Sequence, residues 1–434
     1  MIPNVERPGY FYATMQEIEE IKKYIIPVSK EEYGFYGVQT VPAWYEREDN
    51  FEFMIQRDME KIMPMTAEVI STLRCPYRCE QCSYRPQKES LGVWDNQCKD
   101  KLDMSLGTME IVIQRLVEAG VKNVVFTGGG EPLSNAEVTL QGMKIAKRND
   151  MNVCLYTNGL LMNKERIEKI IENEPQVCRI SIYGFDEKGY ANYTKMEKDG
   201  FFRVVENVKW LIREKQERNL KINIALSFLI HPIMFEHIQA VREIDIWKML
   251  ENLFGMQYLQ QLLSIRFTPA VDYYHKEQIE KSFFDDLFMA VEEADFKAKE
   301  FGVVIKPYYH RLNDLYNRKP YEKCKACGLY AEIGIDGTMY QCCEKLFIKE
   351  YAIGNIINNS IEEIYDSDLR KKVLNSLNVQ QCPPVCKPHE VNKKMREIEC
   401  QSINNPQQYF MWYEMLKKMP RSQDVLGVNN AFES

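Results

Sequence analysis

The middle of the chain alternates between short apolar runs and longer stretches in which apolar residues recur at helical spacing. The short runs are rich in β-branched residues, which predicts parallel strands covered on both faces. The longer stretches predict amphipathic helices between the strands. The predicted strands cover residues 66–73, 123–127, 152–157, 178–183, 221–230 and 262–268.

The clearest predicted helix has one apolar stripe and ends at Gly120, a residue that readily takes the left-handed conformation of a helix end. The stripe consists of Met109, Val112, Ile113, Leu116 and Val117. Six strand–helix units within residues 66–310 predict an α/β fold, an open partial (β/α)6 barrel. In barrels of this kind the functional residues lie at the carboxyl ends of the strands.

The segments on either side of this region differ from it. Residues 1–65 are predicted to be a mostly helical N-terminal extension, because residues 15–26 have helical spacing. Residues 311–434 contain many cysteines and a hairpin signal, Asp336 and Gly337, between two apolar runs. They predict a second, α+β domain that ends in a helical tail.

Composition and charge narrow the class of protein. The chain has 434 residues, of which 45% are apolar, enough for one large α/β domain and a smaller one. No apolar run is long enough to span a bilayer, and no secretory signal is present. Thirteen cysteines suit a reducing cytosol and metal clusters. A net charge of −7 without a long basic tract argues against a nucleic-acid binder. From the cysteine content and from the lack of a membrane span or signal segment we expect a cytoplasmic protein without membrane contact.

Three cysteines follow the first predicted strand with CxxxCxxC spacing: Cys75, Cys79 and Cys82. Three thiolates can hold a [4Fe–4S] cluster and leave one of its four irons open to a further ligand. A zinc clip is an alternative, although zinc needs a fourth ligand and none follows nearby. A disulfide would need an oxidising compartment. The spacing alone leaves iron–sulfur and zinc open.

The second predicted strand ends in a glycine run that is followed by an acid, with the residues Gly128, Gly129, Gly130 and Glu131. Glycines let the backbone approach a ligand closely, and the carboxylate can accept a hydrogen bond from an ammonium group. A phosphate loop or a plain turn is the alternative, but no GK[ST] sequence follows.

Three more polar residues occupy strands or strand ends. Asn158 follows the third predicted strand, Ser181 lies on the fourth and Arg266 on the sixth. Each also has a structural interpretation: an Asn–Gly turn, a hydroxyl satisfied inside the barrel, and a salt bridge. An arginine inside a barrel needs an anionic partner, which a ligand would also supply.

The cysteine spacing and the glycine–glycine–glutamate sequence together resemble the radical S-adenosylmethionine (SAM) superfamily. The resemblance implies that Cys75, Cys79 and Cys82 hold a [4Fe–4S] cluster whose open iron binds SAM. One position departs from the family pattern: Gln81 stands where an aromatic residue usually precedes the third cysteine.

The resemblance also implies the groups that bind SAM. Gly129, Gly130 and Glu131 would hold its amino group. Asn158 would lie in the loop that supports the nucleoside, and Ser181 would reach the ribose or the carboxylate. Arg266 would pair with the SAM carboxylate or with a substrate.

A second group of cysteines lies in the C-terminal region. A hairpin would bring Cys327 near Cys342, and Cys382 and Cys386 could close the site from a later turn. Four soft ligands suit zinc or a fully ligated iron–sulfur cluster. The alternative ligands are Cys324, Cys343 and His389.

The spacing of this second group resembles the SPASM/twitch domain that follows many radical SAM barrels. Nine residues separate Cys327 from Gly337, and four separate Gly337 from Cys342. The later cysteine run of the full SPASM form is absent. The resemblance therefore implies the shorter twitch form, with one auxiliary [4Fe–4S] cluster on Cys327, Cys342, Cys382 and Cys386.

The function that the resemblance implies is an oxidoreductase or maturase that cleaves SAM reductively and takes a hydrogen atom from a substrate C–H bond. We favour peptide modification by crosslinking, epimerisation or oxidation. A dehydrogenase, epimerase or lyase for a sugar, aminocyclitol or nucleotide is the alternative, and a non-catalytic iron–sulfur or zinc scaffold is another. The expected partners are SAM, a peptide or small-molecule substrate, and an electron donor such as flavodoxin or ferredoxin.

Overall fold

The computed structural model describes residues 61–79, 81–85, 89, 102–238, 241–271, 279–307, 309–393 and 396. The predicted N-terminal extension up to residue 60 and the predicted helical tail beyond residue 396 lie outside the described residues. The barrel and the cysteine-rich region that follows it are described.

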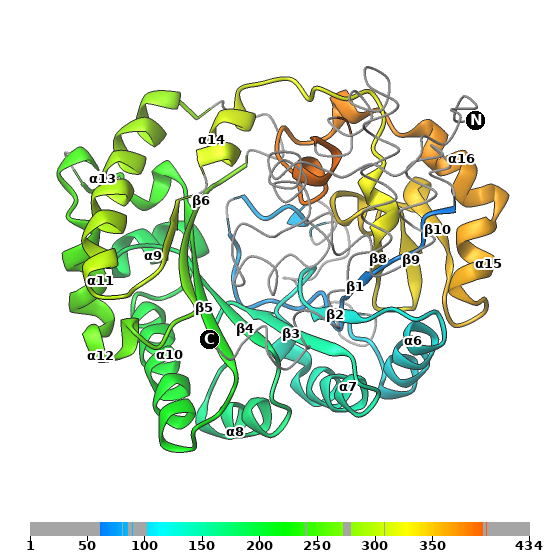
Figure 1. Cartoon of the computed structure of the whole chain (residues 1–434), viewed down its shortest axis with the longest axis horizontal. Helices are drawn as coiled ribbons and strands as arrows, with labels where there is room; N and C mark the ends of the chain where they lie inside the picture. Colours follow the sequence, from blue (N-terminus) through cyan, green and yellow to red (C-terminus); the bar gives the residue numbers. More distant parts are fainter. Residues whose placement is uncertain are drawn as a thin grey trace, which may run out of the picture.

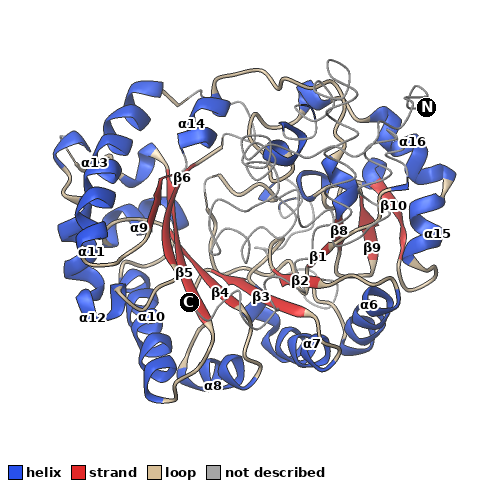
Figure 2. Ribbon diagram, viewed as in Figure 1, coloured by secondary structure: helices blue, strands red, loops and turns tan. Residues whose placement is uncertain are grey.

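Within the described residues, ten strands form one sheet in the order β10-β9-β8-β1-β2-β3-β4-β5-β6-β7 (Figures 1 and 2). Six consecutive parallel strands confirm the predicted partial barrel: β1 (Thr66–Val69), β2 (Asn123–Phe126), β3 (Asn152–Thr157), β4 (Val177–Ile182), β5 (Asn223–Ile230) and β6 (Ser264–Pro269). The sequence missed a further parallel strand, β7 (Ile305–Pro307), because it has only three residues and contains a proline.

Helices cover the outer side of the barrel strands (Figure 1). The helix predicted at residues 109–117 is α6; Ser105 caps its start by accepting from the Thr108 N–H, and Gly120 follows its end with φ +71°. The helices are α6 (Leu106–Glu118), α7 (Ala136–Arg148), α8 (Lys164–Glu172), α9 (Glu187–Thr194), α10 (Asp199–Glu217), α11 (Ile246–Phe254), α12 (Met256–Leu259), α13 (Lys281–Glu300), α14 (Tyr309–Leu315), α15 (Ile361–Asp366) and α16 (Asp368–Ser376).

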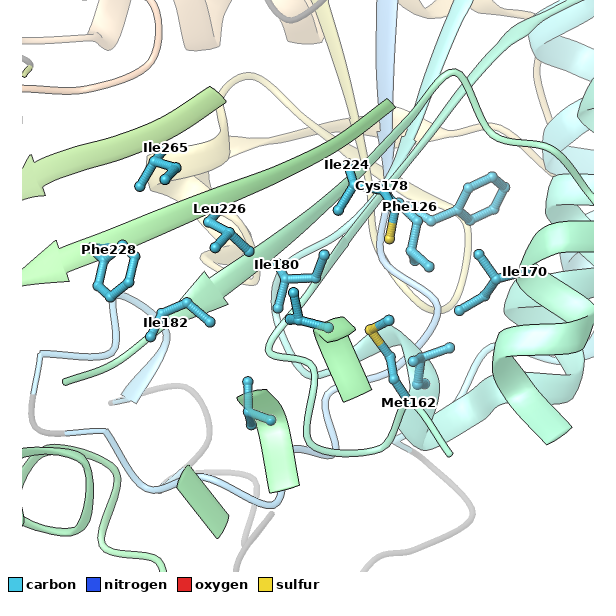
Figure 3. Packing of buried hydrophobic residues seen from close by; sticks show 14 of the residues in the cluster. Phe126, Met162, Ile170, Cys178, Ile180, Ile182, Ile224, Leu226, Phe228 and Ile265 are labelled. Atoms are coloured by element: carbon cyan, nitrogen blue, oxygen red, sulfur yellow. The ribbon is translucent and has the colours of Figure 1, made fainter. Parts of the chain in front are cut away.

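The two faces of the barrel sheet are filled differently. Alternate strand residues such as Ile180 and Leu226 pack with helix residues such as Ile170 in the main core (Figure 3). Cys178 belongs to this outer layer. The inner face holds only a small buried apolar cluster, consisting of Val125, Cys154, Val177 and Ala225. Burial raises the pKa of both Cys154 and Cys178 to about 12, so both thiols are inert packing groups.

The C-terminal strands join the barrel sheet at its β1 edge. β8 (Tyr330–Ile333) runs parallel to β1, and the register pairs Glu68 with Glu332. β8, β9 (Thr338–Tyr340) and β10 (Ala352–Asn355) then continue as an antiparallel ribbon. The turn between β8 and β9 contains Gly337 with φ +78°, as the hairpin signal predicts. The cysteine-rich region therefore extends the sheet of the barrel.

In the part of the chain that the structure describes, no helix is both long enough and apolar enough to cross a membrane.

The close packing of α6 on α7 generates a stability prediction. A Cβ on Gly142 of α7 would lie 2.7 Å from Met109 Sδ and 2.9 Å from the Phe126 ring. We expect Gly142→Ala to lower the free energy of unfolding by about 1–3 kcal/mol, because overpacking outweighs the better helix propensity of alanine. Urea denaturation measures it.

Gly107 of α6 is the matched control, since nothing lies within 4 Å of a Cβ there. We expect Gly107→Ala to leave stability unchanged or to raise it by up to about 1 kcal/mol. Equal effects of the two substitutions would contradict the packing explanation.

Candidate functional site

A cavity of about 320 Å³ opens at the carboxyl ends of the barrel strands. Residues from all six barrel strands or their carboxyl ends line it, as expected for a barrel of this class. The predicted site residues among them are Cys75, Cys79, Cys82, Gly129, Gly130, Glu131, Asn158 and Ser181. The structure thus brings together both sequence motifs and the two polar residues that follow them.

The cysteine loop after β1 is anchored by Tyr77, a buried residue that also lines the cavity. Its ring lies edge-on to Tyr183 and Tyr190 with centroids 5.7 Å apart, and the Tyr77 and Tyr190 hydroxyl oxygens are 3.0 Å apart. Burial raises the pKa of Tyr77 well above its ordinary value. The Arg78 N–H also donates to the Thr194 carbonyl at 2.9 Å. These contacts hold the loop against α9.

The glycine run after β2 lies close to the same loop. A Cβ on Gly130 would lie 2.3 Å from the Arg74 carbonyl oxygen, so no other residue fits without moving the backbone. The Glu131 N–H donates to that same carbonyl at 2.8 Å. The glycine–glutamate segment is therefore fixed against the segment that leads into the three cysteines.

Glu131 is 2% exposed, and its carboxylate connects β2 to β3. Oε1 accepts from Thr157 Oγ1 at 2.6 Å and from the Leu133 N–H at 3.1 Å, and Oε2 accepts from the Asn158 N–H at 2.8 Å. A carboxylate offers about four acceptor sites, so one remains for a ligand. Burial raises the pKa of Glu131, and these hydrogen bonds oppose the rise.

Asn158 contacts the cysteine loop as well as its own turn. Its Nδ2 lies 3.8 Å from Cys75 Sγ, while its Oδ1 accepts from the Leu160 N–H at 3.1 Å. Asn158 therefore forms the Asn–Gly turn that the sequence allowed, and it also lies beside Cys75, a predicted cluster ligand.

Arg266 is not among the residues that line this cavity. It is 4% exposed on β6, where Thr268 lines the cavity instead. Arg179 of β4 does line it, with the guanidinium 3.4 Å from the centroid of the Tyr156 ring. The sequence contained the signal for Arg179, since it alternates with Ser181 on one face of the strand.

A second site gathers five cysteines of the described chain around one cavity: Cys324, Cys327, Cys342, Cys382 and Cys386. Cys327 lies in the 3-10 turn before β8, Cys342 follows β9, and Cys382 follows the 3-10 turn Val379–Gln381. The four predicted ligands are therefore brought together. Cys324, which the sequence left as an alternative, lies with them, whereas Cys343 is not among the lining residues.

Side-chain N–H groups point at three of these sulfurs. Gln341 Nε2 lies 3.3 Å from Cys327 Sγ, and Asn392 Nδ2 lies 3.2 Å from Cys324 Sγ. Lys319 Nζ lies 3.7 Å from Cys386 Sγ. Hydrogen bonds to sulfur stabilise thiolate ligands of iron–sulfur clusters, so the residues present fit such a cluster.

His389, also an alternative ligand, is not among the residues that line the cysteine cavity. Its Nδ1 accepts from the Tyr321 hydroxyl at 2.8 Å, and its Nε2 lies 3.2 Å from Asp314 Oδ2. Burial, reinforced by Lys319, lowers the pKa of His389 to about 4. The imidazole is therefore a neutral structural group here.

Comparison with known proteins adds to this geometry. The model of the radical SAM superfamily matches residues 69–240, and the model of the SPASM iron–sulfur cluster-binding domain matches residues 324–388. The SPASM match includes all five clustered cysteines and ends before His389.

Among curated relatives, the antilisterial bacteriocin subtilosin biosynthesis protein AlbA of Bacillus subtilis is 24% identical over 321 residues. The match covers 72% of this chain and 61% of AlbA, so the chain spans about three fifths of that relative. GTP 3',8-cyclase of Clostridium perfringens is 26% identical over 35% of the chain and 43% of the relative.

Among solved structures, Streptococcus suis SuiB bound to the precursor peptide SuiA has a TM-score of 0.54 at 14% identity. The alignment covers 76% of this chain and 71% of SuiB. This likeness confirms the fold. The two domain matches also indicate the cofactors: a [4Fe–4S] cluster that binds SAM, and auxiliary iron–sulfur binding in the C-terminal region. The chain carries a radical SAM domain at residues 69–240 and a SPASM-type iron–sulfur cluster-binding domain at residues 324–388.

Proposed function

We propose that this protein modifies a peptide by taking a hydrogen atom from one of its C–H bonds. The observation that carries the proposal is a third cavity, of about 460 Å³, that borders both cluster sites. It shares Ala270 with the cavity at the carboxyl ends of the barrel strands, which we call the SAM cavity. It shares Cys382 with the cavity that the five cysteines line, the cysteine cavity. A substrate in this space would contact both sites at once.

The lining of this third cavity suits a peptide. Its lining combines apolar residues such as Phe284 and Leu315 with the cationic residues Arg318 and Lys319. Together with the SAM cavity, the space is large enough for several residues of an extended segment. AlbA and SuiB, whose names concern a bacteriocin and a precursor peptide, support this substrate class. The match to the GTP cyclase covers about a third of the chain and therefore bears on the barrel alone.

The proposed residue roles follow the geometry. Cys75, Cys79 and Cys82 hold the SAM-binding cluster, which when reduced supplies the electron that cleaves SAM to methionine and a 5'-deoxyadenosyl radical. Gly130 brings the backbone close to SAM, and Glu131 accepts a hydrogen bond from the SAM ammonium. We place the electron donor, a flavodoxin or ferredoxin, and the protein itself in a reducing cytosol.

The other polar residues of the SAM cavity orient the cofactor. Asn158 supports the nucleoside and Ser181 reaches the ribose or carboxylate; Arg179, which lines the cavity, is better placed than Arg266 to meet the carboxylate. The buried aromatic wall around Tyr77 and Tyr183 excludes water from the space in which the radical forms.

The role of Glu131 gives a binding prediction. Glu131→Gln removes a charge-assisted hydrogen bond, which contributes about 1.5–3 kcal/mol, so SAM should bind roughly tenfold more weakly or worse. Calorimetry on the reconstituted protein measures the affinity, and the cluster absorbance should not change.

Thr157→Val is the control, because it breaks a hydrogen bond to Glu131 Oε1 while the charge stays. We expect a loss of SAM affinity of less than about threefold. If Thr157→Val weakened SAM binding as much as Glu131→Gln did, the Glu131 carboxylate would have a structural role and would not be a SAM ligand.

The two cluster assignments are tested by iron analysis. Reconstituted protein should hold about eight irons per chain, and a Cys75→Ala, Cys79→Ala, Cys82→Ala triple variant should keep about half. The triple variant should not convert SAM to 5'-deoxyadenosine. Zinc in place of the remaining iron would refute the auxiliary cluster, and SAM cleavage at the parent rate would refute the first assignment.

The substrate class is tested by isotope transfer. With SAM, dithionite and a set of deuterated synthetic peptides, deuterium should appear in 5'-deoxyadenosine, and the mass of the peptide that reacts should change. Deuterated GTP and a deuterated dTDP-sugar form the comparison arms. Transfer from either of them, without transfer from any peptide, would replace this proposal by the small-molecule alternative.

A further inference from the structure

Lys319 is a buried cation beside the cysteine cavity. The residue is 8% exposed, and its Nζ donates to the Pro384 carbonyl at 2.9 Å. The same nitrogen lies 3.7 Å from Cys386 Sγ and 3.5 Å from His389 Nδ1. It also lines the proposed substrate cavity, so it stands between that space and the sulfurs.

No described carboxylate lies within 4.0 Å of this ammonium group. Its partners are a carbonyl, a thiol sulfur and an imidazole, together with the Tyr321 ring at 5.9 Å. Glu344 lines the same cavity but forms no ion pair with Lys319. Because an uncompensated buried charge is costly, a negative group is expected next to Lys319 when the site is filled. An iron–sulfur cluster with thiolate ligands carries that charge.

A hydrogen bond and ion pairs surround the groups that contact Lys319. The Tyr321 hydroxyl donates to His389 Nδ1, and the opposite ring nitrogen lies 3.2 Å from Asp314. Lys393 neutralises Asp314 from the other side, at 3.1 Å. The imidazole therefore lies between the Lys319 ammonium and the Asp314–Lys393 ion pair.

We infer that Lys319 is a positioning residue that raises the reduction potential of the auxiliary cluster through a charge-assisted N–H···S bond to Cys386. A cluster gains one negative charge when it takes up one electron, so a nearby fixed cation stabilises the reduced form more than the oxidised form. Among the described side chains, the other two N–H donors to sulfurs of the cysteine cavity, Gln341 and Asn392, are neutral amides.

The direction of the effect fits the position of the residue. A raised potential makes the cluster a better acceptor for the electron that a substrate radical gives up when it is oxidised by one electron to product. Lys319 lines the cavity from which that electron would come. The inference rests on the proposed auxiliary ligands, and the experiment separates the two.

The test compares Lys319→Met and Lys319→Arg in the full chain with Cys75, Cys79 and Cys82 changed to Ala, so that only the auxiliary cluster remains. EPR-monitored redox titration measures the potential, and iron analysis measures cluster content. We expect Lys319→Met to shift the redox equilibrium at least tenfold toward the oxidised form, about 59 mV for one electron. Lys319→Arg keeps the charge and should stay near the parent.

Lys345→Met is the matched control, because Lys345 lines the same cavity but forms no hydrogen bond to a cysteine sulfur. Lys345→Met should shift the reduction potential of the auxiliary cluster by less than half of the shift expected for Lys319→Met. Equal potentials in Lys319→Met and the parent, with iron retained, would overturn the inference. So would loss of iron in both Lys319 variants, which would show a structural role. Loss of iron in Lys319→Met alone would support the need for a positive charge at this position. Absence of iron in the Cys75, Cys79 and Cys82 triple variant would instead refute the auxiliary cluster.

Discussion

The parallel pairing of β1 with β8 is the constraint on which both sites depend. β1 pairs with β2 on one side, which sets the cysteine loop beside the glycine–glutamate segment, and with β8 on the other. Because β8 runs parallel to β1 and β9 returns antiparallel, Cys327 and Cys342 lie at the amino-terminal end of β1. The loop of Cys75 follows its carboxyl end. The four residues of β1, about 13 Å long, thus separate the two cysteine groups along the sheet.

Side chains from the C-terminal region reinforce this arrangement. Lys387, next to Cys386, forms an ion pair with Glu68 on β1, so the auxiliary site is tied to the strand that carries the first cysteine loop. Phe347 adopts φ +64°, a conformation that costs energy for a bulky residue. Its ring packs edge-on against Tyr84 of the cysteine loop and would lie 3.3 Å from a Cβ on Gly129. This aromatic residue therefore packs against both loops that we propose bind SAM.

The two sites differ in how many hydrogen-bond partners the protein gives to the buried charged group. The carboxylate of Glu131 is almost satisfied by its own protein, with three hydrogen bonds and one open acceptor site for an ammonium. Among the described residues, the ammonium of Lys319 contacts a carbonyl, an imidazole and a cysteine sulfur, and no carboxylate. One site is ready for a positive ligand group, the other for a negatively charged cluster. The cavity between them, bordered by Ala270 and Cys382, gives a substrate access to both.

The sequence by itself determined the six barrel strands, the helix at residues 106–118 and the hairpin at Gly337, because these depend on local periodicity and turn chemistry. It also determined which cysteines follow which strand. Only the tertiary structure showed that β8 joins the barrel sheet, that Cys324 shares a cavity with the other four cysteines, and that Arg179 rather than Arg266 lines the SAM cavity. Strand pairing and the depth of a side chain inside a barrel depend on contacts between residues far apart in the chain. Lys319 shows the same limit: a single lysine carries no pattern, and its role emerges only where folding buries it beside a cysteine sulfur without a carboxylate partner.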